Sequence, residues 1–366
     1  MDNLVLSNML HRPARTLVSV LGIAVGVLLI VFTIGLANGS LREQARREAN
    51  VGAEIMFRAS GSLGLSGSES FRLPVSLAEE INRVEGVQKT VAIGQNSVQA
   101  DNNTGSRLIE GVNFDEYADI AGLRIIEGRK FSGSGGEAII DTGFQKQKKY
   151  KIGDTIKLYD RDFSIVGAYE PAAGARVKIP LSEMQKQLAG EGKASAFLVK
   201  IKEGAAPEQV AENLQSRFPD NQPFLTRDFE ELYLSGFPAL NIFLNVIIGV
   251  AAVISALVIL LTMYTTVTER TRQIGIMKSL GMSNAGIAWI IAQEALLISF
   301  CGVVGGILLT VVLRFLLTRI TTLEVELSPL VWTITMIVGL VGGAIGALYP
   351  ALRAAKLDAV EALSYE

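Results

Sequence analysis

Hydrophobic positions along this chain gather in four long blocks, and most charged residues lie in the segments between them. The blocks cover roughly residues 16–37, 240–264, 296–317 and 328–348. The second block belongs to a longer run, residues 232–268, that contains no Asp, Glu, Lys or Arg. Because about 20 apolar residues cross the hydrocarbon core of a bilayer as a helix, each block predicts a transmembrane helix.

The length of the first block distinguishes a membrane helix from a secretory signal peptide. A signal peptide has an apolar run of roughly 7–15 residues, followed by a small-residue cleavage site. The run after Arg15 extends to about Ala37, and no clear A-x-A sequence closes it. We therefore expect a retained transmembrane helix.

Polar and apolar residues mix in residues 38–236, a stretch long enough to bury a core of its own. Residues 76–79 read Ser-Leu-Ala-Glu, the pattern of a helix capping box, and Pro207 suits the first turn of another helix. Two strand-like runs on either side of residues 160–162 predict a β-hairpin. These features predict an α+β domain.

Good helix formers continue beyond the first block, in residues 41–48. We expect the first membrane helix to extend outward through them as a stalk, and residues 228–233 to form a similar connection into the second membrane helix. Two stalks would couple the outer domain mechanically to the membrane helices.

Composition supports the membrane assignment and narrows the chemistry. Only 19% of residues are charged, against about 25% in soluble domains, and 49% are hydrophobic. The net charge is −2, and no Lys/Arg cluster indicates a nucleic-acid partner. With His11 as its one histidine and Cys301 as its one cysteine, the chain has little material for a metal site, a catalytic triad or a disulfide. We expect no catalytic residue and no metal ligand.

Basic residues indicate the orientation, because cytoplasmic loops carry an excess of Lys and Arg. They occur in the N-terminal segment, in the connection between the second and third blocks, and in the C-terminal tail, whereas the last connection has Arg319 with two glutamates. The termini are therefore predicted to be cytoplasmic and residues 38–236 to lie outside. The basic residues counted are Arg12, Arg15, Arg270, Arg272, Lys278, Arg353 and Lys356.

The predicted fold class is an α-helical membrane protein with four transmembrane helices and a large α+β extracytoplasmic domain inserted between the first and the second. The predicted division is a cytoplasmic amphipathic helix at 1–15, the first transmembrane helix at 16–37, the outer domain with its stalks at 38–236, the second transmembrane helix at 237–268, a cytoplasmic helix and loop at 269–286, the third transmembrane helix at 287–318, a short outer loop at 319–327, the fourth transmembrane helix at 328–352, and a cytoplasmic tail at 353–366.

The connection at residues 269–281 starts polar, gains an apolar side at Ile274 and Met277, and ends at Gly281, a suitable helix C-cap. It can present a small rigid surface to a soluble partner, or lie on the lipid headgroups with its arginines on phosphate. The residues alone leave both interpretations open. Nearby, we expect Glu294, at the start of the third helix, to reach water or to pair with Arg272 or Lys278.

This connection carries a resemblance to a known family. Residues 269–283 (ERTRQIGIMKSLGMS), followed by QEALL at 293–297, resemble the permease of the FtsX/MacB type of ABC transporter. The tail at 349–363 is similar to the family's closing motif, which usually has proline where Ala359 stands. Residues 12–22 match its opening, and residues 150–167 are similar to part of its extracytoplasmic module. The matches span nearly the whole chain in the family's order.

The resemblance implies a subunit of the bacterial cytoplasmic membrane that pairs with a second copy or a similar permease. Two cytoplasmic ABC ATPase subunits would hold ATP and Mg²⁺, because this chain has no G-x-x-x-x-G-K-[ST] motif. ATP-driven motion would pass to the outer domain, for export or extraction of a hydrophobic or amphipathic substrate, with or without an extracytoplasmic adaptor. The implied coupling residues are Glu269, Arg270, Thr271, Arg272, Gln273, Ile274, Gly275, Met277, Lys278 and Gly281. The alternative is a signalling platform that activates or senses an extracytoplasmic partner protein without transport.

Glycine pairs spaced four residues apart mark candidate helix contacts, since small residues let helices approach closely in lipid. Gly22 with Gly26 is the first candidate for a dimer seam, and Gly302 with Gly306 is a second such pair. Packing inside a single four-helix bundle explains the spacing equally well.

Overall fold

The computed structural model describes residues 13–61, 71–99, 106–133, 135–236, 238–320 and 325–358. The expected amphipathic helix at 1–15 falls mostly outside these residues, as does the end of the tail. The chain forms two compact units. The membrane unit comprises residues 1–39, 238–319 and 323–366, and the outer unit comprises residues 40–237 with 320–322.

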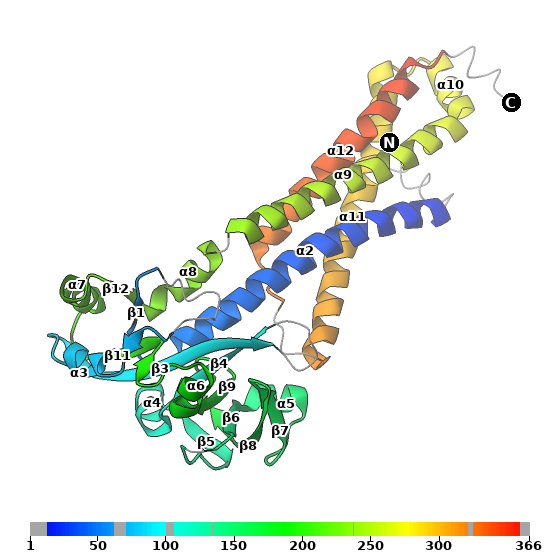
Figure 1. Ribbon diagram of the computed structural model, residues 1–366. Helices are drawn as coiled ribbons and strands as arrows, with labels where there is room; N and C mark the ends of the chain where they lie inside the picture. The colour runs from blue at the N-terminus through cyan, green and yellow to red at the C-terminus, as the bar shows by residue number, and fades with distance from the viewer. Residues whose placement is uncertain are drawn as a thin grey trace. The chain divides into compact units, whose positions relative to one another are not determined.

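Within the described residues, four helices are long and apolar enough to span a membrane. They are α2 (Pro13–Ala49), α9 (Pro238–Glu269), α11 (Asn284–Ile320) and α12 (Pro329–Lys356). Figure 1 shows α9 and α12 running side by side. The four spans predicted from the apolar blocks are confirmed, and α2 continues as one helix through the polar residues expected to form a stalk.

Helices of the membrane unit approach one another closely at glycines. A Cβ atom added to Gly346 of α12 would lie 2.3 Å from the carbonyl oxygen of Ala256 in α9. One added to Gly343 would lie 1.9 Å from Oγ of Ser299 in α11. Because lipid offers no hydrophobic drive for helix association, such close backbone contact is what holds the bundle together.

In the described part of the outer unit, ten strands form one mixed sheet in the order β12-β1-β11-β3-β4-β9-β6-β8-β5, with β7 also paired to β8 (Figure 1). β4 runs parallel to β9, and β6 runs parallel to β8. β2 (Leu73–Pro74) and β10 (Lys193–Ala194) form a separate pair. The strands of the large sheet are β1 (Ile55–Ala59), β3 (Val87–Gln99), β4 (Ser106–Val112), β5 (Arg124–Gly128), β6 (Glu137–Asp141), β7 (Thr155–Leu158), β8 (Arg161–Glu170), β9 (Val177–Pro180), β11 (Ala196–Ile201) and β12 (Asn221–Leu225).

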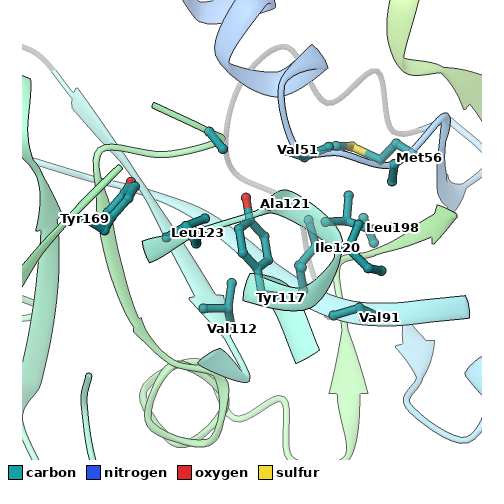
Figure 2. Close-up of a cluster of buried hydrophobic side chains, with 14 of the residues drawn as sticks. Val51, Met56, Val91, Val112, Tyr117, Ile120, Ala121, Leu123, Tyr169 and Leu198 are labelled. Atoms are coloured by element: carbon teal, nitrogen blue, oxygen red, sulfur yellow. The ribbon is translucent and has the colours of Figure 1, made fainter. Parts of the chain in front are cut away.

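Helices of the outer unit take part in three buried clusters. Residues of α3 and α7 pack with β1 and β11 in one, and residues of α5 and α6 pack with β6, β8 and β9 in another. The third brings α4, α8 and the end of α2 against the middle strands, and Figure 2 shows Tyr117 and Ile120 of α4 beside Val91 and Leu198. The helices are α3 (Leu77–Asn82), α4 (Phe114–Ala121), α5 (Thr142–Lys148), α6 (Leu181–Gln187), α7 (Pro207–Arg217), the 3-10 turn η1 (Thr226–Asp228) and α8 (Phe229–Ser235).

Of the three local predictions for the outer unit, two are confirmed and one is wrong. The helix at Pro207 is confirmed, and so is the hairpin, although its turn falls at Tyr159 and Asp160, with φ of 53° and 60°. Positive φ at both central residues is the type I′ turn that suits the twist of paired strands. The capping box is wrong, because Ser76 has helical backbone angles and its side chain makes no capping hydrogen bond.

Candidate functional site

The connection between α9 and α11 contains a separate short helix, α10 (Thr271–Ser279). The helical path breaks at Arg270, whose φ is −107°. The helix ends in a Schellman motif, in which the Met282 amide donates to the Met277 carbonyl (3.1 Å) and the Gly281 amide to the Lys278 carbonyl (3.0 Å). Gly281 has φ of +90°, so the predicted stop depends on its lacking a Cβ.

One face of α10 is buried in the membrane unit. Thr271, Ile274 and Gly275 are buried, and Ile274 belongs to the main cluster of that unit, where Met277 packs against it. These four residues of the predicted coupling set therefore hold α10 in place, and their side chains contribute little to its exposed face.

The opposite face is exposed and partly apolar. Leu280, just past the helix end, is 82% exposed and Ile276 is 45% exposed, beside exposed Arg272, Gln273 and Ser279. The candidate set included Arg272 and Gln273 but missed Ile276, Ser279 and Leu280. Their spacing from Arg272 by four, seven and eight positions places all of them on one helical face, so the periodicity could have found them.

Two basic residues of the candidate set point back to the bundle. Arg270 Nη1 lies 3.4 Å from Glu294 Oε2 of α11, and both side chains are mostly buried. Lys278 Nζ donates to the carbonyl oxygens of Ala355 (2.9 Å) and Leu357 (2.6 Å), at the C-terminal end of α12, where a cation is also favoured by the helix dipole. Glu294 thus pairs with Arg270, where we expected Arg272 or Lys278.

The site is consequently a rigid helix held at both ends. Arg270 fixes its start to α11, Lys278 fixes its end to α12, and its free face offers an apolar pair within a polar surround. Exposed apolar residues rimmed by polar groups are typical of sites that contact a protein or a membrane. Glu269 is exposed at the end of α9, next to this face.

Aromatic residues lie near the same ends of α9 and α12. The rings of Tyr264 and Tyr349 stack with centroids 6.5 Å apart, and the Arg353 guanidinium lies 4.7 Å from the Tyr264 ring centre. Tyrosine with a basic neighbour is typical of the membrane–water boundary. Sequence reasoning counted Arg353 and missed both tyrosines, which only the pairing of α9 with α12 brings together.

The candidate glycines all face helices of the same chain. A Cβ on Gly22 would lie 3.3 Å from Val258, and one on Gly26 would lie 3.3 Å from Ser255, both in α9. Gly302 and Gly306 of α11 face α2, at Ile23 and Ala24 respectively. Packing within one bundle therefore accounts for their spacing, and a dimer seam at Gly22 and Gly26 stays a prediction.

The other kinds of site to consider in the described residues are a metal site and a ligand cleft. No group of three His, Cys, Asp or Glu there could hold a metal ion. A cleft of about 590 Å³ in the outer unit is lined by Phe114, Phe131 and Leu181 among others. Lys130 pairs with Asp115 across it at 2.7 Å.

Two family profiles match most of the chain. The profile of the MacB-like periplasmic core domain matches residues 16–217, and that of the FtsX-like permease C-terminal region matches residues 245–359. The chain is 24% identical to the macrolide export ATP-binding/permease protein MacB of Bdellovibrio bacteriovorus, over 97% of this chain and 60% of that protein.

Two relatives match from end to end. The chain is 26% identical to the uncharacterized ABC transporter permease MJ1507 of Methanocaldococcus jannaschii, over 98% of this chain and 96% of that protein. It is 25% identical to the uncharacterized ABC transporter permease YknZ of Bacillus subtilis, over 99% and 98% respectively. The chain thus spans about 60% of the length of the MacB proteins that it matches, and nearly all of the two permeases.

Proposed function

This chain belongs to the family of FtsX-like ABC transporter permeases with a MacB-like periplasmic core domain, and from that premise we propose that it transmits ATP-driven motion from a separate ATPase to its outer domain. The observation that carries the proposal is the exposed face of α10. An exposed leucine and isoleucine on a helix fixed at both ends suit a docking contact that must bear load.

The partners follow from the same premise. Two copies of a cytoplasmic ABC ATPase would supply ATP and Mg²⁺ and seat α10, and the permease would act as a pair, with a second copy or a similar chain. We place the protein in the bacterial cytoplasmic membrane with both termini and α10 in the cytoplasm, on the distribution of Lys and Arg. The cargo we propose is hydrophobic or amphipathic, exported or extracted at the outer domain.

The experiment reconstitutes the full chain in lipid nanodiscs with the Walker-motif ATPase that copurifies with it, and measures ATP hydrolysis. Ile276→Asp, which places a charge in the apolar contact, should reduce permease-stimulated hydrolysis about tenfold, the loss expected from ~1.4 kcal/mol of binding energy. Arg272→Glu should weaken stimulation as well.

A matched control is Ile126→Asp, which makes the same change at a residue 58% exposed in the outer unit. It should leave stimulated hydrolysis at the parent level. Normal stimulation by the Ile276→Asp and Arg272→Glu variants would contradict the coupling assignment. Stimulated hydrolysis without any movement of substrate would instead favour the signalling alternative.

A further inference from the structure

The end of α2 that belongs to the outer unit is held mainly by polar side chains. Among its hydrophobic residues, Ala45 is fully buried and Leu41 is packed at the edge of the cluster around it. An alanine offers little apolar area, and apolar contact has no preferred direction. The polar residues of the same two turns, by contrast, contact several different elements of the outer unit.

Arg47 fixes this helix end to one side of the sheet. Its Nη2 donates to Asp141 Oδ2 (3.0 Å) and its Nε to the Gly174 carbonyl (2.9 Å), while the Gly174 amide donates back to the Arg47 carbonyl (2.7 Å). Asp141 ends β6, and its other oxygen accepts from the Phe144 amide as the N-cap of α5. One guanidinium therefore links α2 to β6, α5 and the segment between β8 and β9.

Glu48, the next residue, fixes α2 to the other side. Its Oε1 accepts from the Tyr233 hydroxyl of α8 (2.5 Å), and its Oε2 lies 3.6 Å from Arg58 Nη2 on β1. Gln44, one turn earlier, donates to the same Tyr233 hydroxyl at 3.3 Å. Glu48 and Arg58 are each 2% exposed, so this pair is closed to water.

The Glu48–Arg58 pair continues into a row of buried polar residues across the sheet. Arg58 donates to Gln95 Oε1 (2.7 Å), Gln95 donates to Glu110 Oε1 (3.0 Å), and Glu110 pairs with Lys178. Gln95 stands opposite Glu110, and Glu110 opposite Lys178, in the registers of β3, β4 and β9. Burial lowers the pKa of Lys178, and the Glu110 carboxylate opposes that shift.

Gly174 lies between Arg47 and the Glu110 end of this row. A Cβ there would lie 2.2 Å from Glu110 Oε2, so the backbone that accepts from Arg47 also lies directly against the Glu110 carboxylate. The Arg47 contacts and the row that begins at Glu48 therefore meet at Gly174 through close packing.

We propose that Arg47 and Glu48 are positioning residues that fix the rotation and register of α2 on the outer sheet. Sliding a helix by one residue moves it about 1.5 Å and turns it about 100°, which would leave both charges buried without partners. Charge-assisted hydrogen bonds are also directional, unlike apolar packing. Through these contacts, a translation or rotation of α2 is transmitted to β1, β6 and α8 together. Its functional meaning rests on the proposed motion transmission.

The test measures the position of the α2 end in the full chain, in nanodiscs and without any ATPase. In a Cys301→Ser background, spin labels at Arg46→Cys and Lys146→Cys, both exposed, report the distance from α2 to α5 by double electron–electron resonance. The key variant is Arg47→Met with Asp141→Asn. It removes both charges together, and the asparagine keeps the α5 cap.

We expect a narrow distance distribution in the parent and one about twofold broader in this variant, as local order at the helix end is lost. A matched control, Lys89→Met with Asp119→Asn, removes an exposed ion pair and should leave the distribution unchanged. A parent-like width in the folded Arg47→Met/Asp141→Asn variant would overturn the proposal.

A second variant covers the case in which the first does not fold. Glu48→Gln with Arg58→Met, read with labels at Arg46→Cys and exposed Glu212→Cys on α7, should broaden that distance in the same way, and an unchanged width would overturn the proposal equally. Because neither measurement uses ATP, failure here is separate from failure of the proposed function, which is read by stimulated hydrolysis.

Discussion

The outer unit and the membrane unit enclose polar groups in opposite ways. In the outer unit, Glu110 and Lys178 have no exposed surface and pair with each other across two strands. In the membrane unit, the buried hydroxyls of Ser299 and Thr310 bond back to their own helix, at the Ala295 and Gly306 carbonyls, whereas Ser19 of α2 shares a hydrogen bond with Thr262 of α9 (2.8 Å). The Arg270–Glu294 pair lies at the end of the bundle that carries α10.

The difference follows from the surroundings of each unit. A domain in water can enclose a row of charges when each has an opposite partner, and gains a fixed register from it. A charge within lipid is costly even near a partner, so helices there satisfy polar groups locally and associate through small residues. Register in the outer unit thus depends on side-chain charge, and in the membrane unit on backbone contact.

The largest effect should come from breaking the buried row. Lys178→Met leaves Glu110 as an unpaired buried carboxylate and should cost about 3–5 kcal/mol of unfolding free energy. Denaturant unfolding, monitored by hydrogen exchange of the β4 and β9 amides, measures this loss of unfolding free energy. Adding Glu110→Gln should recover more than half of the loss. If the single variant is no less stable than the double one, the charge does not set stability here.

Backbone contact in the membrane unit should give the next effect. A Cβ on Gly306 would lie 2.6 Å from the Ala24 carbonyl oxygen, whereas one on Gly305 would lie 3.7 Å from the nearest atom, an ordinary contact. Gly306→Ala should therefore cost about 1–3 kcal/mol and Gly305→Ala very little. The midpoint of thermal unfolding, monitored by the fluorescence of the two tryptophans, measures this cost. Equal midpoints for the two variants would count against close packing of α2 with α11.

The same contrast explains what could be predicted from the sequence. Membrane helices are encoded by long apolar runs, and α10 by a local stop at Gly281, so both could be found from short windows. The buried row could not, because Glu110 and Lys178 are 68 residues apart and meet only through the parallel pairing of β4 with β9. The pairing of Glu48 with Arg58 could not be predicted either, since charged residues such as Glu48 on a stalk suggest solvent exposure and Arg58 lies on a separate element, β1.

The sequence located the segment that forms α10, but not the direction of its side chains. Lys278 turns inward because its acceptors are backbone carbonyls at the end of α12, and backbone groups leave no signal in a sequence. Ile276 and Leu280 were left out of the coupling set, whereas Ile274 and Met277 were included in it. Only the packing of Ile274 against the bundle decides which side is buried.

A smaller effect should arise at the end of α10, where local backbone geometry decides. Gly281→Ala places a Cβ in a left-handed conformation, at a cost of about 1–2 kcal/mol. Amide exchange of α10 should accelerate about fivefold to thirtyfold, since ~1.4 kcal/mol corresponds to about tenfold. Gly286→Ala, inside helix α11, is the control and should not accelerate it. Equal exchange in the two variants would show that the left-handed stop at Gly281 does not limit the stability of α10.

The smallest effect concerns a charge of the outer unit at its surface, where pairing gives little. Hydrogen bonds from Arg129 and from the Ser132 amide lower the pKa of Glu137 from 4.5 to about 2. Since the folded value lies below the unfolded one, this carboxylate stabilises the fold above pH 4.5, and the contribution is lost as pH falls from 4.5 towards about 2. Glu137→Gln should flatten the dependence of the unfolding midpoint on pH in that window. The change should stay well below that of Lys178→Met, because Arg129 is 58% exposed and solvent screens the pair. A steeper fall in the Glu137→Gln variant than in the parent would contradict this sign.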